Sequence, residues 1–289
     1  MLKTFIFLLI GLSFSTTDLF AQFKTKPRNN SPSINASQWW IGVGGGFNLT
    51  GMQVLEQYHV LTPTRGDLPK KDYSNYNVTG TQFNLMLNYS FSNISLLLQP
   101  GINRHHFTYE NMLQWQSSEN PENNIFIDNH HSHSINYLNI PLRFRYSFEF
   151  GGAIVPFIQG GGYYGFLLEA DKTIESSGID NASGSSNQLS LGSQSDEITD
   201  LFYKTNYGLS AGLGLMLAIG DGMAIFEVNY DRGFRNIVNP ETRYTIDKFV
   251  TGAYDVPDDL VMSNISANFT FAIPLKFITS KDFVPVNRK

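Results

Sequence analysis

Apolar and polar side chains alternate along residues 261–277, which read VMSNISANFTFAIPLKF. One set of alternate positions is apolar, and the set between them is mostly polar or small. The apolar set consists of Ile265, Ala267, Phe269, Phe271, Ile273, Leu275 and Phe277, and the other of Ser266, Asn268, Thr270, Ala272, Pro274 and Lys276. A repeat of two residues is the spacing of a β-strand with one apolar and one polar face. The segment is longer than most strands of soluble proteins, so it restricts the chain to folds built from long, two-faced strands.

Seven further segments alternate in a related way, and the connections between the segments differ regularly in length. The expected strands are residues 39–50, 78–91, 94–109, 134–148, 154–169, 203–219, 223–237 and 261–277. Short turns are expected at 92–93, 151–152 and 220–222, where Gly, Asn, Asp and Ser supply turn chemistry. The other connections, 51–77, 110–133, 170–202 and 238–258, are long and polar.

This order of turns and loops predicts an all-β fold. The expected architecture is an eight-stranded antiparallel transmembrane β-barrel with four long extracellular loops and three short periplasmic turns. In hydrocarbon every backbone amide must be paired, so strands cross a bilayer only as members of a closed sheet. A soluble β-sandwich and a soluble lipocalin-like barrel would also alternate, although a sandwich has shorter strands. The loop 170–200, rich in Ser, Gly, Asn and Asp, is expected to be mobile and exposed.

The first 21 residues have the pattern of an export signal. Lys3 precedes the apolar run 5–14, which is too short to span a bilayer as a helix. Cleavage is expected between Ala21 and Gln22, and the alternative is an uncleaved N-terminal anchor. The expected parts are a signal peptide at 1–21, a periplasmic N-terminal segment at 22–38, the outer-membrane β-barrel at 39–279 and a periplasmic C-terminal tail at 280–289.

The composition agrees with a barrel and excludes several kinds of site. Aromatic residues make up 14% of the chain, charged residues make up 16%, and there are 25 glycines. This suits aromatic side chains at a lipid interface and strands that bend. The chain has no Cys, so disulfides, thiol nucleophiles and cysteine metal sites are excluded. A net charge of −5 gives no indication of nucleic-acid binding.

The fourth expected strand contains a family motif. Residues 137–146 read YLNIPLRFRY, in which Tyr137, Leu138, Ile140 and Pro141 match a Tyr-Leu-x-Ile-Pro-Leu signature. The chain therefore resembles the PorT-like outer-membrane β-barrel family of Bacteroidetes. The resemblance implies an eight-stranded barrel in the outer membrane. It also implies an association with the type IX secretion and gliding apparatus, to which the founding member of the family is linked.

Charged side chains occur at positions that the alternation places inside the barrel. They are Arg143 and Arg145 on the fourth strand and Glu227 and Asp231 on the seventh. The polar residues Gln99, Asn103, Gln159 and Asn206 are expected inside as well. The interior of an eight-stranded barrel is about wide enough for side chains to fill it. We therefore expect a hydrogen-bonded plug of ion pairs, and the alternative is the selectivity lining of a pore.

Five of the six histidines flank the second long loop. They are His105, His106, His130, His131 and His133. Such a group could bind Zn²⁺ or Cu²⁺ or sense acidity, but the spacing matches no known closed metal site. A polar, solvated loop base is therefore expected, with no metal and no cofactor. Ser132, His133 and Asp128 lie close in sequence, but no nucleophile motif accompanies them, so no catalytic residues are expected.

These observations favour a non-enzymatic outer-membrane β-barrel that serves as a structural or docking component of the cell envelope. Its expected partners are outer-membrane lipid and envelope or secretion-machinery proteins, with no nucleic acid. A small porin or transport barrel is the first alternative. A lipid-modifying outer-membrane enzyme is the second.

Overall fold

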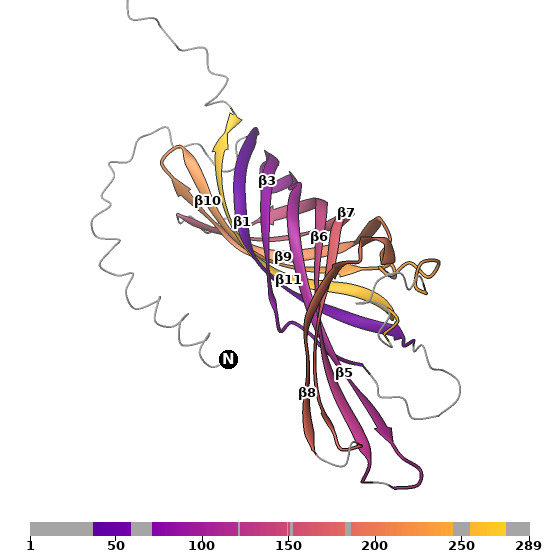
Figure 1. The fold of residues 1–289 in the computed structure, drawn as a ribbon. Coiled ribbons are helices and arrows are strands. Elements are labelled where there is room, and N and C mark those ends of the chain that lie inside the picture. The colour runs from indigo at the N-terminus through magenta and orange to yellow at the C-terminus, as the bar shows by residue number, and fades with distance from the viewer. Residues whose placement is uncertain are drawn as a thin grey trace, which may run out of the picture. The chain divides into compact units, whose positions relative to one another are not determined.

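A computed structural model describes residues 37–58, 71–120, 122–148, 150, 153–182, 186–244 and 255–275 (Figure 1). The expected signal peptide, the C-terminal tail and Phe277, the end of the last expected strand, lie outside these ranges. Strands dominate the described residues, so the all-β prediction is confirmed. They are β1 (Gln38–Glu56), β2 (Asp72–Ser74), β3 (Thr79–Phe91), β4 (Ile94–Leu98), β5 (Gly101–Gln116), β6 (Asn124–Ser147), β7 (Ile154–Asp180), β8 (Asn187–Glu197), β9 (Thr205–Ile219), β10 (Gly222–Gly233) and β11 (Asp259–Pro274), with one 3-10 turn at Thr199–Leu201. The described part of the chain contains no helix with the length and hydropathy that crossing a membrane requires.

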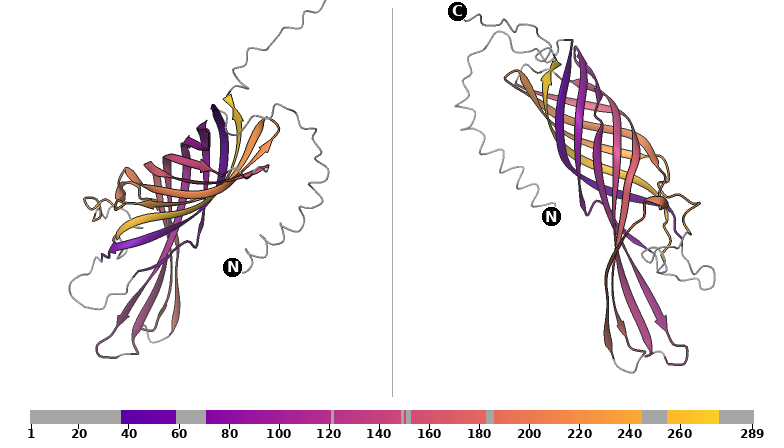
Figure 2. Two further views of the ribbon diagram at one scale, coloured as in Figure 1. Left: turned by 180° about the vertical axis from the view of Figure 1, so that it is seen from behind. Right: turned by 45° about the horizontal axis from the view of Figure 1, so that its top comes forward.

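The strands form one antiparallel sheet that closes on itself. Pairing runs from β1 through β3, then β4 and β5, then β6, β7, β9 and β10 to β11. β11 pairs with β1, in a register that places Trp40 opposite Pro274, and this pairing closes the ring. Figure 2 shows the tilted strands wound around a common axis. A closed sheet is what the sequence analysis expects of strands that cross a bilayer.

β4 and β5 are two parts of one expected strand. Both pair with β3 and with β6, and the register across the break does not change. The break falls at Gln99 and Pro100, opposite Pro141 of β6. Proline has no backbone N–H to donate to a ladder. Backbone bonds from Leu85 N to Pro100 O (2.9 Å) and from Gln99 N to Pro141 O (3.2 Å) keep the two neighbouring strands joined there.

Apolar side chains dominate the outward face of the ring, and the polar side chains of its strands face inward. On β11, Phe269 is 58% exposed, whereas the neighbouring Asn268 and Thr270 are 6% and 0% exposed. The outward-facing apolar band has an edge, because the outward positions of β6 change from Leu138 to Asn136 and Ser134. This distribution is the reverse of that in a soluble protein, and it is the one expected where the outer face of a barrel contacts lipid.

The interior of the ring is filled in three layers. An apolar cluster lies near the short turns and comprises Trp40, Met86, Leu97, Val155, Phe157, Met216, Met223, Ile225 and Ala272. A larger apolar cluster lies toward the other end and includes Met52, Phe107, Tyr109, Ile135, Tyr137, Leu167, Phe202, Ile237, Leu260 and Met262. Polar side chains occupy the level between them. Among the described residues, side chains therefore pack the interior of the ring at all three levels.

Two of the expected loops are largely strand, which corrects the sequence analysis. β5 continues to Gln116 and β6 begins at Asn124, so most of 110–133 is a hairpin. β7 continues to Asp180, and β8 pairs with it within the segment that was expected to be mobile. We call residues 108–132 and 171–197 the arm, because β5 to β8 extend there past the ring (Figures 1 and 2). The apolar alternation that identified the other strands is weak here, because both faces of the arm carry polar residues.

Candidate functional site

The four charged residues predicted to lie in the lumen form ion pairs between β6 and β10. Arg145 Nη2 lies 3.0 Å from Glu227 Oε2, and both side chains are fully buried. The guanidinium of Arg145 also lies over the Phe157 ring, 4.0 Å from its centroid. Arg143 Nη2 lies 3.5 Å from Asp231 Oδ1, which is partly exposed. A buried ion pair persists only where further hydrogen bonds satisfy its remaining polar atoms.

Two glutamines and a serine supply those hydrogen bonds. Gln99 accepts from Arg143 Nη1 at 2.6 Å and donates to Glu227 Oε1 at 3.1 Å. Gln159 accepts from Arg145 Nε at 3.0 Å and donates to Glu227 Oε2 at 3.2 Å. Arg143 Nε donates to Ser210 at 2.7 Å. Both ion pairs thus belong to one connected network, which crosses the lumen from β6 to β10.

The space left in this network is small. Asn103, which is half-buried, lines a cavity of about 30 Å³ together with Gln82, Asn84 and Asn139. A cavity of this size holds at most about two water molecules. Asn206, also predicted to be lumenal, is 1% exposed. The arrangement can hold charge and a few water molecules in place.

The family motif lies on β6 where the pairing changes character. Tyr137 is fully buried in the larger apolar cluster, next to a bulge where the register with β7 shifts between Asn136 and Tyr137. Leu138 and Ile140 are partly exposed on the outer face. Pro141 is buried opposite the break between β4 and β5. The motif thus places Tyr137 in the core and Pro141 at an interruption of the hydrogen-bond ladder. Both are structural roles.

The five histidines separate onto two faces of the sheet, because successive strand residues point in opposite directions. His105, His131 and His133 are 1%, 1% and 5% exposed, so the expectation of a solvated loop base is wrong for these three. His130 is exposed and lies 3.2 Å from Glu110. Within the described ranges no group of three or more His, Asp or Glu side chains is placed to hold a metal ion. Ser132 and His133 also lie on opposite faces, so the strand does not assemble Ser132, His133 and Asp128 into a triad.

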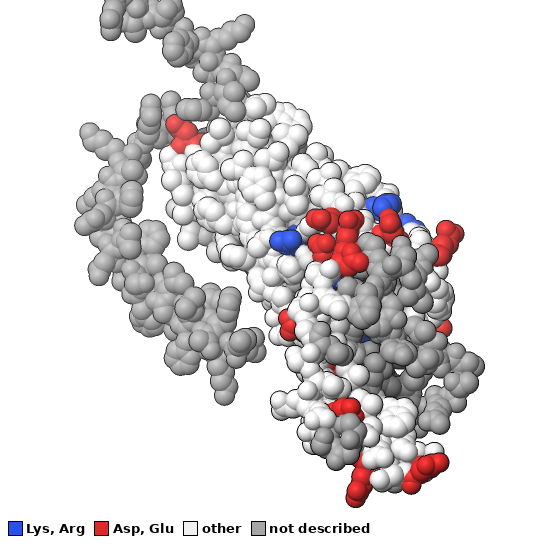
Figure 3. Space-filling model, viewed as in Figure 1, with Lys and Arg blue, Asp and Glu red and all other residues white. Residues whose placement is uncertain are grey.

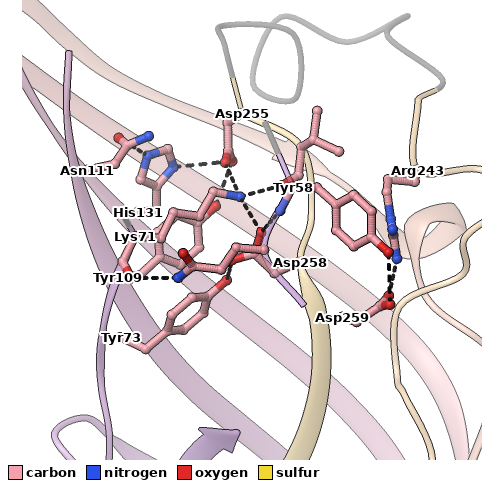
Figure 4. Close-up of polar contacts among 12 residues, drawn as sticks. Tyr58, Lys71, Tyr73, Tyr109, Asn111, His131, Arg243, Asp255, Asp258 and Asp259 are labelled. Atoms are coloured by element: carbon pink, nitrogen blue, oxygen red, sulfur yellow. Dashed lines mark hydrogen bonds and ion pairs between the residues drawn. The ribbon is translucent and has the colours of Figure 1, made fainter. Parts of the chain in front are cut away.

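A second buried charged group lies at the end of the ring from which the arm extends. We call Lys71, Lys172, Asp255 and Asp258 the mouth cluster. Figure 4 labels three of them, Lys71, Asp255 and Asp258. Lys71 Nζ lies 2.9 Å from Asp255 Oδ1 and 3.1 Å from Asp258 Oδ1, and Lys172 also contacts Asp255. All four side chains are at most 3% exposed. The segment 255–258 is thereby bound to the inner face of β7.

Aromatic rings enclose the mouth cluster. The Tyr109 hydroxyl donates to Asp255 at 2.6 Å, and the Tyr73 hydroxyl donates to Asp258 at 2.9 Å. The Tyr109 ring stacks on His131, with centroids 4.4 Å apart. His133 stacks on Phe107, also at 4.4 Å. The rings exclude water from the charges, which strengthens the interactions among them.

The environment fixes the charge state of these groups. Burial by itself would raise the pKa of Asp255, but the nearby Lys172 and Lys71 outweigh it and hold that pKa well below its usual value. Burial lowers the pKa of His131 to about 3. Burial, together with repulsion from Lys172, also lowers the pKa of His133 well below its usual value. At neutral pH Asp255 is therefore charged and lies beside uncharged His131 and His133.

Sequence reasoning missed the mouth cluster. Lys71, Asp255 and Asp258 fall in expected loops, where alternation carries no information. One available signal was Lys172. It lies two residues from both Ala170 and Ile174, so the three side chains point inward from the same face of β7. A charge at an inward position requires a partner, but spacing alone could not identify a partner more than 80 residues away. The charge pairs here join segments that are distant in the chain.

Comparison with known proteins gives a family match and several solved structures of low similarity. The family model described as outer membrane protein beta-barrel domain matches residues 20–239. A search of curated proteins finds no match. OprG from Pseudomonas aeruginosa is 14% identical with a TM-score of 0.38, covering 81% of this chain and 96% of that chain. Ail from Yersinia pestis, solved with the heparin analogue sucrose octasulfate, is 10% identical with a TM-score of 0.29, covering 82% and 99%. Neisserial surface protein A is 11% identical with a TM-score of 0.29, covering 80% and 95%.

The family match and the strand arrangement lead to the same class of protein. The matched residues include most of the strands of the closed ring. Since the family model covers well over half of the chain, this chain belongs to the outer membrane protein beta-barrel domain family and is an outer-membrane β-barrel protein.

Proposed function

We propose that the chain is an eight-stranded transmembrane barrel that docks other envelope components and neither conducts solutes nor catalyses a reaction. In this proposal residues 1–21 are the export signal, the short turns face the periplasm and the arm is extracellular. The closed ring supports the strand count, because β4 and β5 share one register and β2 and β8 pair outside the ring. Membership of the PorT-like Bacteroidetes family, and with it an association with type IX secretion or gliding machinery, belongs to the same proposal.

The filled lumen is the observation that carries the non-conducting role. The network from Arg143 to Glu227 lies between two apolar layers, and the adjoining cavity measures about 30 Å³. A porin needs more strands to leave an aqueous channel. Purified protein in planar lipid bilayers is therefore expected to give no conductance steps, with a larger porin as the positive control. Regular single-channel steps would contradict the proposal and favour the small-pore alternative.

The arm carries the docking role. It extends past the outward-facing apolar band, so it has no lipid to contact, and loops that project from barrels commonly carry function. Crosslinked outer membranes should therefore yield a reproducible partner with the intact chain. The matched control is a variant in which Asn-Gly replaces residues 111–129, joining the Cα partners Glu110 and His130. Equal recovery with both chains, or no partner with either, would contradict docking through the arm. Lipid mass spectrometry of a deletion strain tests the enzyme alternative, and altered lipid would favour it.

A further inference from the structure

The arm is a four-stranded sheet, and on one of its faces the part of the chain that the structure describes provides no packing partner. Across that face Glu110 is opposite His130, His130 is opposite Glu175, and Glu175 is opposite Ser193. These side chains lie on the opposite face from Tyr109 and His131, which point into the ring. A groove of about 760 Å³ lies along this part of the arm. Sheets normally bury at least one face against another element, and the arm buries its inner face only near the ring.

The groove is acidic. Asp72, Glu110, Asp128 and Glu175 line it, and none of the described lining residues is Lys or Arg. The arm as a whole contains nine Asp and Glu and a single Lys, although the complete chain has a net charge of only −5. That one lysine, Lys172, is buried and bound to Asp255. In Figure 3 the lower end of the molecule, where β5 and β8 lie, accordingly shows red side chains and no blue ones.

Apolar side chains lie among these carboxylates. Met112 is 46% exposed and Ile179 is 43% exposed on the same face of the arm. On the ring such exposure is explained by lipid, but these two residues lie well beyond the band that ends near Leu138. An exposed apolar group surrounded by charge of one sign is typical of a surface that binds another protein. The exposed apolar pair and the acidic groove are therefore two independent indications that this face of the arm binds another protein.

We propose that this groove binds a Lys- or Arg-rich segment of a partner protein. The partner's cations would pair with Asp72, Glu110, Asp128 and Glu175, and its aliphatic stems would cover Met112 and Ile179, as long basic side chains do on apolar surfaces. Charge of a single sign steers an oppositely charged partner toward the groove before contact. This inference rests on the proposed function in one respect, that the arm lies outside the membrane.

The test uses the full chain in detergent micelles and fluorescent decalysine as the probe. In the groove variant, D72N, E110Q, D128N and E175Q are combined. The control variant combines E56Q, D200N, D221N and E241Q, which changes the net charge equally at exposed acids outside the groove. Four exposed ion pairs together predict about tenfold or more weaker binding for the groove variant. The control is expected to bind within about twofold of the unmodified chain.

Three outcomes would overturn the proposal. Equal loss in both variants would mean attraction by net charge alone. Equal binding by all three chains would exclude the groove. Calcium binding that the groove variant loses, with decalysine binding unchanged, would assign the groove to a divalent cation instead. Heat-modifiable migration of each sample separates these results from a failure of the barrel itself, since an unfolded barrel would not change its migration on heating.

Discussion

The lumenal ion pair between Arg145 and Glu227 is the residue-scale feature that the sequence anticipated best. Both positions have the inward phase of their strands, and two opposite charges in one small barrel have few other partners. The glutamines that complete the network were recognised as lumenal, but not as the bridges between the pairs. Side-chain bridges of this kind depend on register between strands, and the alternation within a single strand does not specify that register.

Glu227→Gln should destabilise the barrel by about 3–5 kcal/mol, because it leaves the buried Arg145 without its counter-charge. Urea unfolding in lipid vesicles measures this. Asp221→Asn, an exposed change in the turn before β10, should alter the free energy of unfolding by less than about 0.5 kcal/mol. Replacing the pair together, as R145M with E227L, should recover much of the loss. A Glu227→Gln variant as stable as the Asp221→Asn control would contradict this account of the network.

The buried histidines beside the mouth cluster, His131 and His133, predict that the stability of the protein is sensitive to acid. Burial lowers the pKa of His131 to about 3 and that of His133 well below its usual value, so the folded state binds fewer protons than the unfolded state. Stability is therefore present above the unfolded pKa of about 6.5 and declines as the pH falls below it, by up to about 1.4 kcal/mol per pH unit for each histidine. His131, Asp255, Lys71 and Lys172 face His133, and the two lysines oppose its protonation. Below about pH 4, protonation of Asp255 adds to the loss.

His133→Phe should reduce that acid sensitivity. The ring stacks on Phe107, and its Nδ1 has no hydrogen-bond partner among the described residues, so phenylalanine fits the site. Unfolding of both chains between pH 7.5 and 4.5 should show a smaller decline for the variant, by about one histidine's share. Equal declines would mean that another group controls the acid response. His130→Phe is the matched control, because His130 is exposed, and it should leave the decline unchanged.

At the scale of elements, the ring strands were predictable and the arm was not. Each ring strand separates lipid from a filled lumen, so its sequence must alternate, and β3 and β11 were located to within a few residues. Both faces of the arm are exposed or partly exposed over much of its length, which removes that constraint. Its residues are joined by backbone pairing between strands such as Glu110 opposite His130, and only the three-dimensional register shows this.

Because the outer half of the arm pairs only with itself, the ring should fold without part of it. Replacing residues 113–127 by Asn-Gly joins the Cα partners Met112 and Asp128 with a two-residue turn that suits a hairpin. The free energy of unfolding is expected to change by less than about 1 kcal/mol, and heat-modifiable migration should persist. In contrast, Ala267→Pro removes a donor from β11, which pairs on both sides, and should prevent folding. Loss of folding in the shortened chain would show that the arm is part of the barrel's core.

On the scale of the whole molecule, exposed apolar side chains occur on two surfaces, and these surfaces have different surroundings. The outward face of the ring carries Phe269 and its neighbours, and the arm carries Met112 and Ile179. Alternation in the sequence predicted the first surface, since lipid demands it along every ring strand. The second surface was hidden in expected loops, and its composition resembles that of ordinary polar connections. The lumen and the mouth cluster differ in the same way. The lumenal residues lie on alternating ring strands and were predicted. The members of the mouth cluster come from β7 and from segments between strands, and they were not predicted.

An arginine scan of these two surfaces distinguishes lipid from water. Phe269 lies midway along the outward row of β11, so Phe269→Arg should cost about 2–4 kcal/mol of barrel stability in lipid vesicles. Ile179→Arg, with a similar exposed fraction of 43% against 58%, should cost less than about 0.5 kcal/mol because its side chain already faces water. Both values come from urea unfolding of the same preparation. Similar costs at the two positions would place the arm in the bilayer, or the ring outside it, and either result would contradict an extracellular arm on a membrane-embedded barrel.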